Sequence, residues 1–239
     1  MHPCTRTILV AALLLMPASG LRAQTAADPS GHWEGAIDIP GNSIQFELDL
    51  AKNGAGELMG VVTSRDAKGG LPLARIAVEG RSVTFYARSD QPFHGVLSPD
   101  ARSISGDTTL SGYTLPFSMS RTGDARIEPP ATGAPITREL EGTWNGALTV
   151  DGTALRLVLA MSNQPGGLSV GRMELVDEGG LIVPVVIAQS SSRVNVELRG
   201  VRGSYTGTLN GDGTELAGTW TNGSISVPLT FRRTVAEGK

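Results

Sequence analysis

Hydrophobic and polar residues alternate with a period of two through most of the chain after residue 30. In the second half, the alternation is interrupted by pairs such as Asp151-Gly152 and Asn222-Gly223, which are typical of β-hairpin turns. The pattern predicts eight short strands, over residues 143–150, 154–162, 168–176, 181–188, 193–199, 203–209, 214–221 and 224–232. Because loops this short join neighbouring antiparallel strands, we expect an up-and-down meander.

One face of the predicted strands is apolar and the other is polar, so one face is expected to cover a core. The apolar set is Trp144, Leu148, Val150, Leu155, Leu157, Leu159, Met161, Ile225, Val227, Leu229 and Phe231, with Ile44, Phe46, Leu48, Leu50, Tyr113, Leu115, Phe117 and Met119 in the first half. Eight such strands suit a small closed barrel, which leaves no exposed edge. A membrane-spanning barrel would need its apolar face outward and aromatic girdles, and only 5% of the residues are aromatic.

The two halves of the chain are copies of one unit. Gly31-His32-Trp33-Glu34-Gly35 aligns with Gly142-Thr143-Trp144-Asn145-Gly146, and Pro116 to Thr122 aligns with Pro228 to Thr234. This repetition predicts an all-β protein of two tandem small antiparallel barrels with about eight strands each. We place repeat 1 at residues 30–122 and repeat 2 at residues 139–234. Residues 123–138, rich in Pro, Gly and Ala, are expected to form a linker.

The first residues have the pattern of an export signal. Arg6 precedes an apolar run over residues 8–16, Pro17 follows it, and small residues come next. We expect a signal peptide over residues 1–23, with cleavage after Gly20 or Ala23, and a periplasmic or secreted, soluble product. The apolar run is shorter than a membrane span requires. The only cysteine, Cys4, lies before this run, so we expect neither a lipid anchor nor a disulfide.

The start and end of each repeat resemble those of the lipocalin and calycin barrels. Gly31, Trp33 and Arg121 match the family's Gly-x-Trp and its terminal arginine, as do Gly142, Trp144 and Arg233. In that family the pair is structural, which implies that Arg121 lies over Trp33, and Arg233 over Trp144, to close one barrel end. Repeat 2 also looks like the small β domain that precedes the catalytic domain of some secreted bacterial serine hydrolases of the α/β-hydrolase kind. That resemblance implies an accessory module, since no Gly-x-Ser-x-Gly elbow follows.

Few residues could carry catalysis. His32 and His94 fall on the outward register, so we expect solvated surface histidines rather than metal ligands or general bases. Asp38 and Asp49 also alternate outward and are expected to serve solubility. Removal of residues 1–23 takes away Arg6 and Arg22 and no acid, which leaves a net charge of about −5 and argues against a nucleic-acid partner.

The sequence therefore predicts an exported binding or interaction module that is not an enzyme, with no catalytic, cofactor or metal residues. The expected partner is a small apolar ligand held in a barrel mouth, or an exported protein. Two alternatives stay open. One is a purely structural pair of barrels with filled interiors, and the other is a hydrolase-associated enzyme with a site at a barrel mouth.

Overall fold

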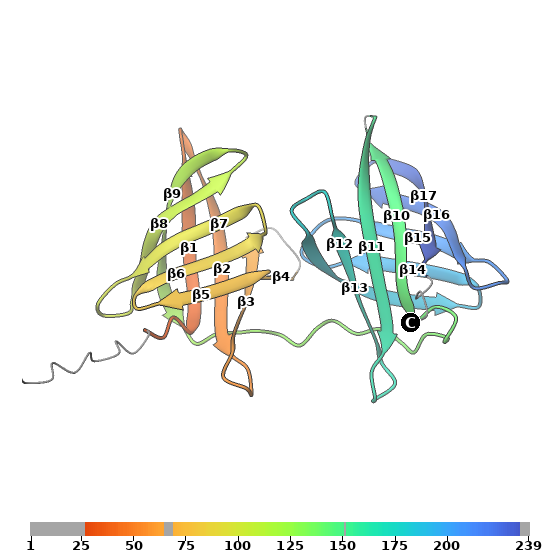
Figure 1. The fold of residues 1–239 in the computed structure, drawn as a ribbon, viewed down its shortest axis with the longest axis horizontal. Coiled ribbons are helices and arrows are strands. Elements are labelled where there is room, and N and C mark those ends of the chain that lie inside the picture. The colour runs from red at the N-terminus through yellow and green to blue at the C-terminus, as the bar shows by residue number, and fades with distance from the viewer. Residues whose placement is uncertain (1–26, 65–68, 151, 235–239) are drawn as a thin grey trace, which may run out of the picture.

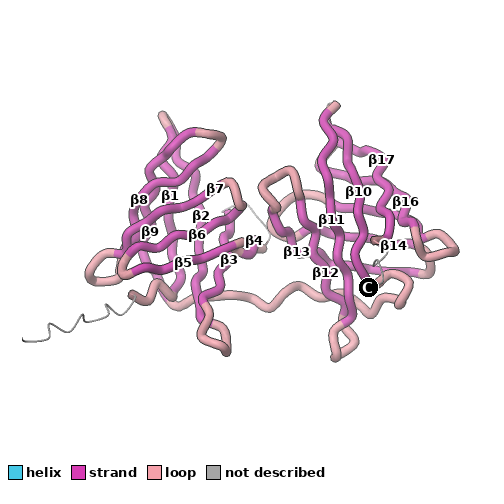
Figure 2. The backbone as a smooth tube through the Cα atoms, in the orientation of Figure 1, coloured by secondary structure: helices cyan, strands magenta, loops and turns pink. Residues whose placement is uncertain are grey.

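The computed structural model describes residues 27–64, 69–150 and 152–234. The predicted signal peptide therefore lies outside the described residues. These residues form two antiparallel β-sheets, one per repeat, and no helix, as Figures 1 and 2 show. The all-β, up-and-down class predicted from the alternation is confirmed.

The strands of each repeat follow one another in chain order. Repeat 1 contains β1 (Gly31–Ile39), β2 (Asn42–Lys52), β3 (Leu58–Ser64), β4 (Leu71–Pro72), β5 (Arg75–Glu79), β6 (Ser82–Arg88), β7 (Gln91–Leu97), β8 (Ser103–Leu110) and β9 (Tyr113–Gly123). Repeat 2 contains β10 (Gly142–Val150), β11 (Thr153–Asn163), β12 (Ser169–Leu175), β13 (Leu181–Ser190), β14 (Arg193–Leu198), β15 (Ser204–Leu209), β16 (Glu215–Asn222) and β17 (Ile225–Arg233). The eight strands of repeat 2 match the eight predicted ones to within a few residues.

Repeat 2 is a closed barrel. Each strand pairs with the next, and β10 pairs with β17 to complete the ring, with Trp144 opposite Arg233 and Gly146 opposite Phe231. The inward residues of all eight strands form one buried core. The ring leaves no strand edge unpaired, as predicted for a barrel.

Repeat 1 has the same meander, but its ladder stays open between β4 and β5, so it is a half-barrel. The difference lies at β4, which has two residues, whereas its counterpart β13 in repeat 2 has ten and carries Pro184 where β4 carries Pro72. The chain crosses between the two edges at Leu73 and Ala74, whose amides donate to the carbonyls of Gly60 and Tyr86 at 2.9 and 2.8 Å. Its core contains four phenylalanines in contact with one another, Phe46, Phe85, Phe93 and Phe117.

Three residues assigned to the apolar face are exposed instead of buried. Ile44, Tyr113 and Ile225 have exposed fractions of 38%, 72% and 51%. Each lies beside a hairpin turn, where the strand pair extends beyond the core. The period-two pattern gave the correct face, but it does not reveal where a hairpin leaves the barrel.

The two repeats touch through polar turns and one apolar strand. The guanidinium of Arg88 lies 2.9 Å from the carboxylate of Glu178, and the amide of Ser89 donates to the carbonyl of Gly179 at 2.9 Å. On the same side, Leu71 of β4 packs against the core of repeat 2. The short edge strand of the half-barrel is thus covered by the other repeat, which protects it from edge-to-edge pairing.

A pair of glycines lies opposite each other across two adjacent strands in both repeats. Gly95 faces Gly106 in repeat 1, and Gly207 faces Gly218 in repeat 2. A β-carbon built on Gly218 would overlap the carbonyl oxygen of Thr206 on the neighbouring strand. The sequence at these positions therefore permits a close backbone approach that no larger residue allows.

We expect Gly218→Ala to lower the free energy of unfolding by about 1–3 kcal/mol, because the methyl group must displace a backbone carbonyl. Urea unfolding followed by circular dichroism measures the loss. Thr219→Ala, on the exposed face of the same strand, is the control and should leave the transition unchanged. Equal midpoints for the two variants would contradict the close approach.

Candidate functional site

The interior of repeat 2 is occupied by side chains rather than by a ligand cavity. Trp144, Tyr205 and Phe231 are fully buried, and the rings of Tyr205 and Phe231 meet edge to face with centroids 5.2 Å apart. The hydroxyl of Tyr205 donates to the carbonyl of Leu216 at 2.8 Å, and burial raises the pKa of this phenol above its ordinary value. The phenol is thereby held neutral and bonded within the core, and it takes no position at a barrel mouth.

The Trp–Arg ends of the two repeats are built alike. In repeat 1, the guanidinium carbon of Arg121 lies 4.8 Å from the centre of the Trp33 ring, within cation–π range. The indole N–H of Trp33 donates to the carbonyl of Pro29 at 2.9 Å, and Arg121 donates to the carbonyl of Asp28 at 3.0 Å. The residues before β1 are thus held across the barrel end.

Repeat 2 reproduces this arrangement with equivalent residues. Arg233 lies 4.5 Å from the centre of the Trp144 ring, and the Trp144 indole donates to the carbonyl of Leu140 at 3.0 Å. Arg233 donates to the carbonyls of Gly213 at 2.8 Å and Glu141 at 2.6 Å, and also to that of Glu139. The structure therefore places the four predicted closure residues, Trp33, Arg121, Trp144 and Arg233, in two pairs, and every polar contact they make is to backbone within the fold.

The assignment of His32 and Asp49 to a solvated surface is wrong. Both point outward from their strands, but they are only 5% and 7% exposed, and the chain that follows β9 passes beside Asp49 at Arg126. One carboxylate oxygen of Asp49 accepts the Nδ1–H of His32 at 2.8 Å and the backbone N–H of Arg126 at 2.7 Å. The pair therefore anchors the start of the connecting segment, residues 123–138, to the outer face of repeat 1.

The other two candidates lie where the sequence placed them. Asp38 is exposed near the β1–β2 turn, and His94 is exposed on β7, 3.3 Å from the hydroxyl of Thr84. Within the described residues, no three His, Cys, Asp or Glu side chains come close enough together to hold a metal ion.

The connecting segment also borders a groove on the outer face of repeat 2. From repeat 1 it runs past both sheets (Figure 1) and enters repeat 2 at Ile136, which is buried in the core and bonded to Asn163. Between this segment and the strands β10, β11 and β12 lies a cavity of about 680 Å³. Its principal lining residues are Pro129, Pro130, Thr143, Ala160, Val170 and Arg172. We call this cavity the groove; its volume lies within the range of small-ligand pockets.

The groove has a basic group and apolar walls. Arg172 projects from β12 on the exposed face, opposite Ala160 of β11, while Pro129 and Pro130 form the opposite wall. Ser162 and Gln164 add a hydroxyl and an amide to the lining. No signal in the sequence pointed to the groove, because it depends on where the segment 129–132 lies.

Over residues 27–64, 69–150 and 152–234, no helix is long and apolar enough to cross a membrane.

No family model and no curated protein match the chain. Among solved structures, it is similar to a candidate outer membrane protein of Bacteroides fragilis NCTC 9343, at 11% identity and a TM-score of 0.26, covering 86% of this chain and 97% of that one. It is also similar to a protein of unknown function from the DUF3598 family of Nostoc punctiforme PCC 73102, at 12% identity and a TM-score of 0.27, covering 86% and 96%.

Proposed function

We propose that the protein is an exported, non-catalytic binding module whose binding site is the groove on the outer face of repeat 2, not the barrel interior. The observation that carries the proposal is the cavity of about 680 Å³ beside a barrel whose interior is filled by side chains. A partly apolar concave surface with a few polar groups is the usual form of a binding site.

The arrangement of the rest of the chain supports a scaffold role for the barrels. The Trp–Arg closures and the buried histidine–aspartate pair make their hydrogen bonds to groups within the protein, which favours a structural role for them. The resemblance of repeat 2 to the accessory β domain of secreted hydrolases agrees with a binding module that lacks catalysis. The predicted signal peptide supports export.

A groove-filling substitution tests this function. The probe is N-phenyl-1-naphthylamine, an uncharged apolar dye that fluoresces strongly once it is removed from water. We expect the dye to bind the mature protein saturably, and Ala160→Phe to abolish binding because the ring fills the groove from β11. Ala147→Phe adds the same ring on an exposed position of β10 outside the groove lining and should bind like the wild type. Equal dye binding in both variants, or none in the wild type, would remove the groove as the site.

A further inference from the structure

The groove lies at the position where repeat 1 already holds a length of chain. In repeat 1, His32, Asp49 and Val61 are cross-strand partners on β1, β2 and β3. In repeat 2, the partners Thr143, Ala160 and Arg172 occupy the same register on β10, β11 and β12. Each residue of the second row follows its counterpart by 111 positions, so the two rows are equivalent by duplication.

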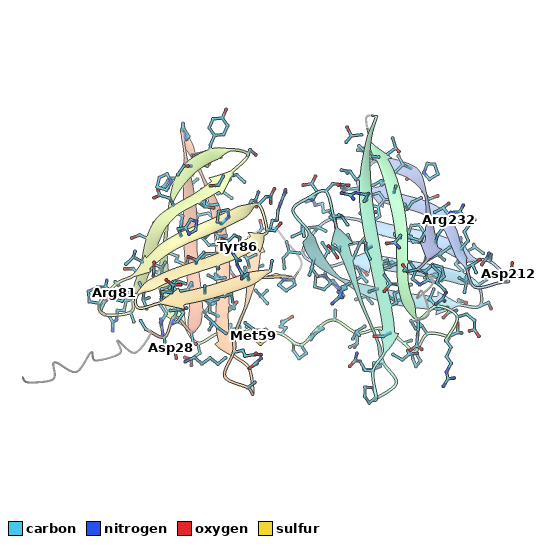
Figure 3. All side chains as sticks on the ribbon, viewed as in Figure 1. Asp28, Met59, Arg81, Tyr86, Asp212 and Arg232 are labelled. Atoms are coloured by element: carbon cyan, nitrogen blue, oxygen red, sulfur yellow. The ribbon has the colours of Figure 1, made fainter. Side chains whose placement is uncertain are left out.

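The first row shows what this face can bind. Gly123, the last residue of β9, is paired with His32 of β1. The chain then continues as an irregular segment, and its backbone N–H at Arg126 is held by the Asp49 carboxylate. In repeat 2 the equivalent row lines the groove, and Thr143 is exposed where His32 is buried. Met59, labelled in Figure 3 and equivalent to the groove residue Val170, is 44% exposed on this face of repeat 1.

The two rows carry charges of opposite sign, and the charge lies on different strands. Repeat 1 carries the acid Asp49 on its second strand, with the apolar Val61 beside it, whereas repeat 2 carries Ala160 with the base Arg172 beside it. Within the described residues, Arg172 forms no ion pair, although Arg88, Arg156, Arg199 and Arg232 do. A guanidinium with five donors matches a carboxylate in two-point geometry.

We propose that the groove binds an extended peptide that carries an acidic residue. The carboxylate of the peptide is held by Arg172, and the peptide lies over β10 and β11 on the face where, in repeat 1, the chain after β9 is bound to Asp49 at Arg126. This inference rests on the proposed function and names the partner class. Pro129 and Pro130 contact the apolar side chains of the peptide. The hydroxyl of Ser162 and the amide of Gln164 form hydrogen bonds with its backbone groups. Because the chain as a whole is acidic, with a net charge of −3, selectivity for an acid has to come from Arg172 itself.

Two pools of fluorescein-labelled octapeptides test the proposal by anisotropy. The pools have random sequences apart from the fourth position, which is glutamate in one and glutamine in the other. We expect the glutamate pool to bind the mature protein about 10-fold more tightly, the usual value of a charge-assisted hydrogen bond. Arg172→Gln should remove this preference and Arg172→Lys should keep part of it, while Arg193→Gln, an exposed arginine on β14, should leave it unchanged.

The outcomes separate the proposal from the function on which it rests. If Ala160→Phe blocks both pools equally and Arg172→Gln changes neither, the groove is a binding site without acid selectivity, and the proposal is overturned alone. If neither pool binds while the neutral dye still does, the groove takes small apolar molecules and not peptides. If either pool binds only after deletion of residues 235–239, the intact chain does not take an outside peptide in the groove, and the proposal is overturned. Absence of both peptide and dye binding overturns the proposed function as well.

Discussion

Trp144→Ala is expected to lower the free energy of unfolding of repeat 2 by about 3–5 kcal/mol, the usual effect of truncating a large buried aromatic residue. The side chain is fully buried, and its ring supports the Arg233 guanidinium at 4.5 Å. Its removal opens a cavity at the barrel end and leaves the carbonyl of Leu140 without its donor. Urea unfolding of the mature protein, followed by far-UV circular dichroism, measures the change.

Two further variants separate the contributions at this closure. Trp144→Phe keeps an aromatic ring beneath Arg233 but removes the indole donor. We therefore expect its free energy of unfolding to lie between those of the wild type and the alanine variant. Thr149→Ala, on the exposed face of the same strand, should leave the unfolding transition in place. A loss below about 1 kcal/mol for Trp144→Ala would mean that the barrel end is held by other contacts.

The barrel of repeat 2 could be predicted because the sequence patterns that specify its strands and turns are local. Each strand has an alternating pattern, and turns such as 210–213 contain the Asn and Gly residues that hairpins require. Once eight short strands follow one another with short loops, neighbouring strands must pair in order. Repeat 1 departs from this at β4, which has only two residues and leaves the ladder open. The proline of β4 does not predict this opening, because the equivalent Pro184 lies within the ten-residue strand β13 of the closed barrel.

The candidate site could not be predicted in the same way, because it depends on an irregular segment. Residues 123–138 have no periodic pattern, and nothing in their composition states which face they cover. The same segment is bound to the buried Asp49 in repeat 1 and borders a cavity beside Arg172 in repeat 2. The position of a residue on the outward face of a strand therefore did not suffice to predict that its side chain is exposed. The differences between the repeats at Asp49 and Ala160 and at Val61 and Arg172 indicate that the two outer faces differ, but they do not indicate a groove.

Asp49→Ala is expected to lower the free energy of unfolding by about 2–4 kcal/mol and to release the start of the connecting segment. The carboxylate is the shared acceptor of two donors, the His32 ring and the Arg126 amide, and its loss leaves both of them without a partner. An unpaired buried polar group costs about 1–3 kcal/mol, which makes this variant more damaging than an ordinary surface change. Local opening should also expose the peptide bond after Arg126, so trypsin should cleave there faster than in the wild type.

Asp38→Ala is the matched control, because it removes an aspartate from the neighbouring strand where the side chain is exposed. It should change neither the unfolding transition nor the rate of cleavage after Arg126. Asp49→Asn retains an acceptor oxygen for the Arg126 amide and should lose less stability than the alanine variant. If Asp49→Ala and Asp38→Ala behave alike in both measurements, residues 123–126 are not held by the aspartate. The comparison between the covered face of repeat 1 and the open groove of repeat 2 would then lose its basis, since that comparison requires repeat 1 to bind its own chain through this carboxylate.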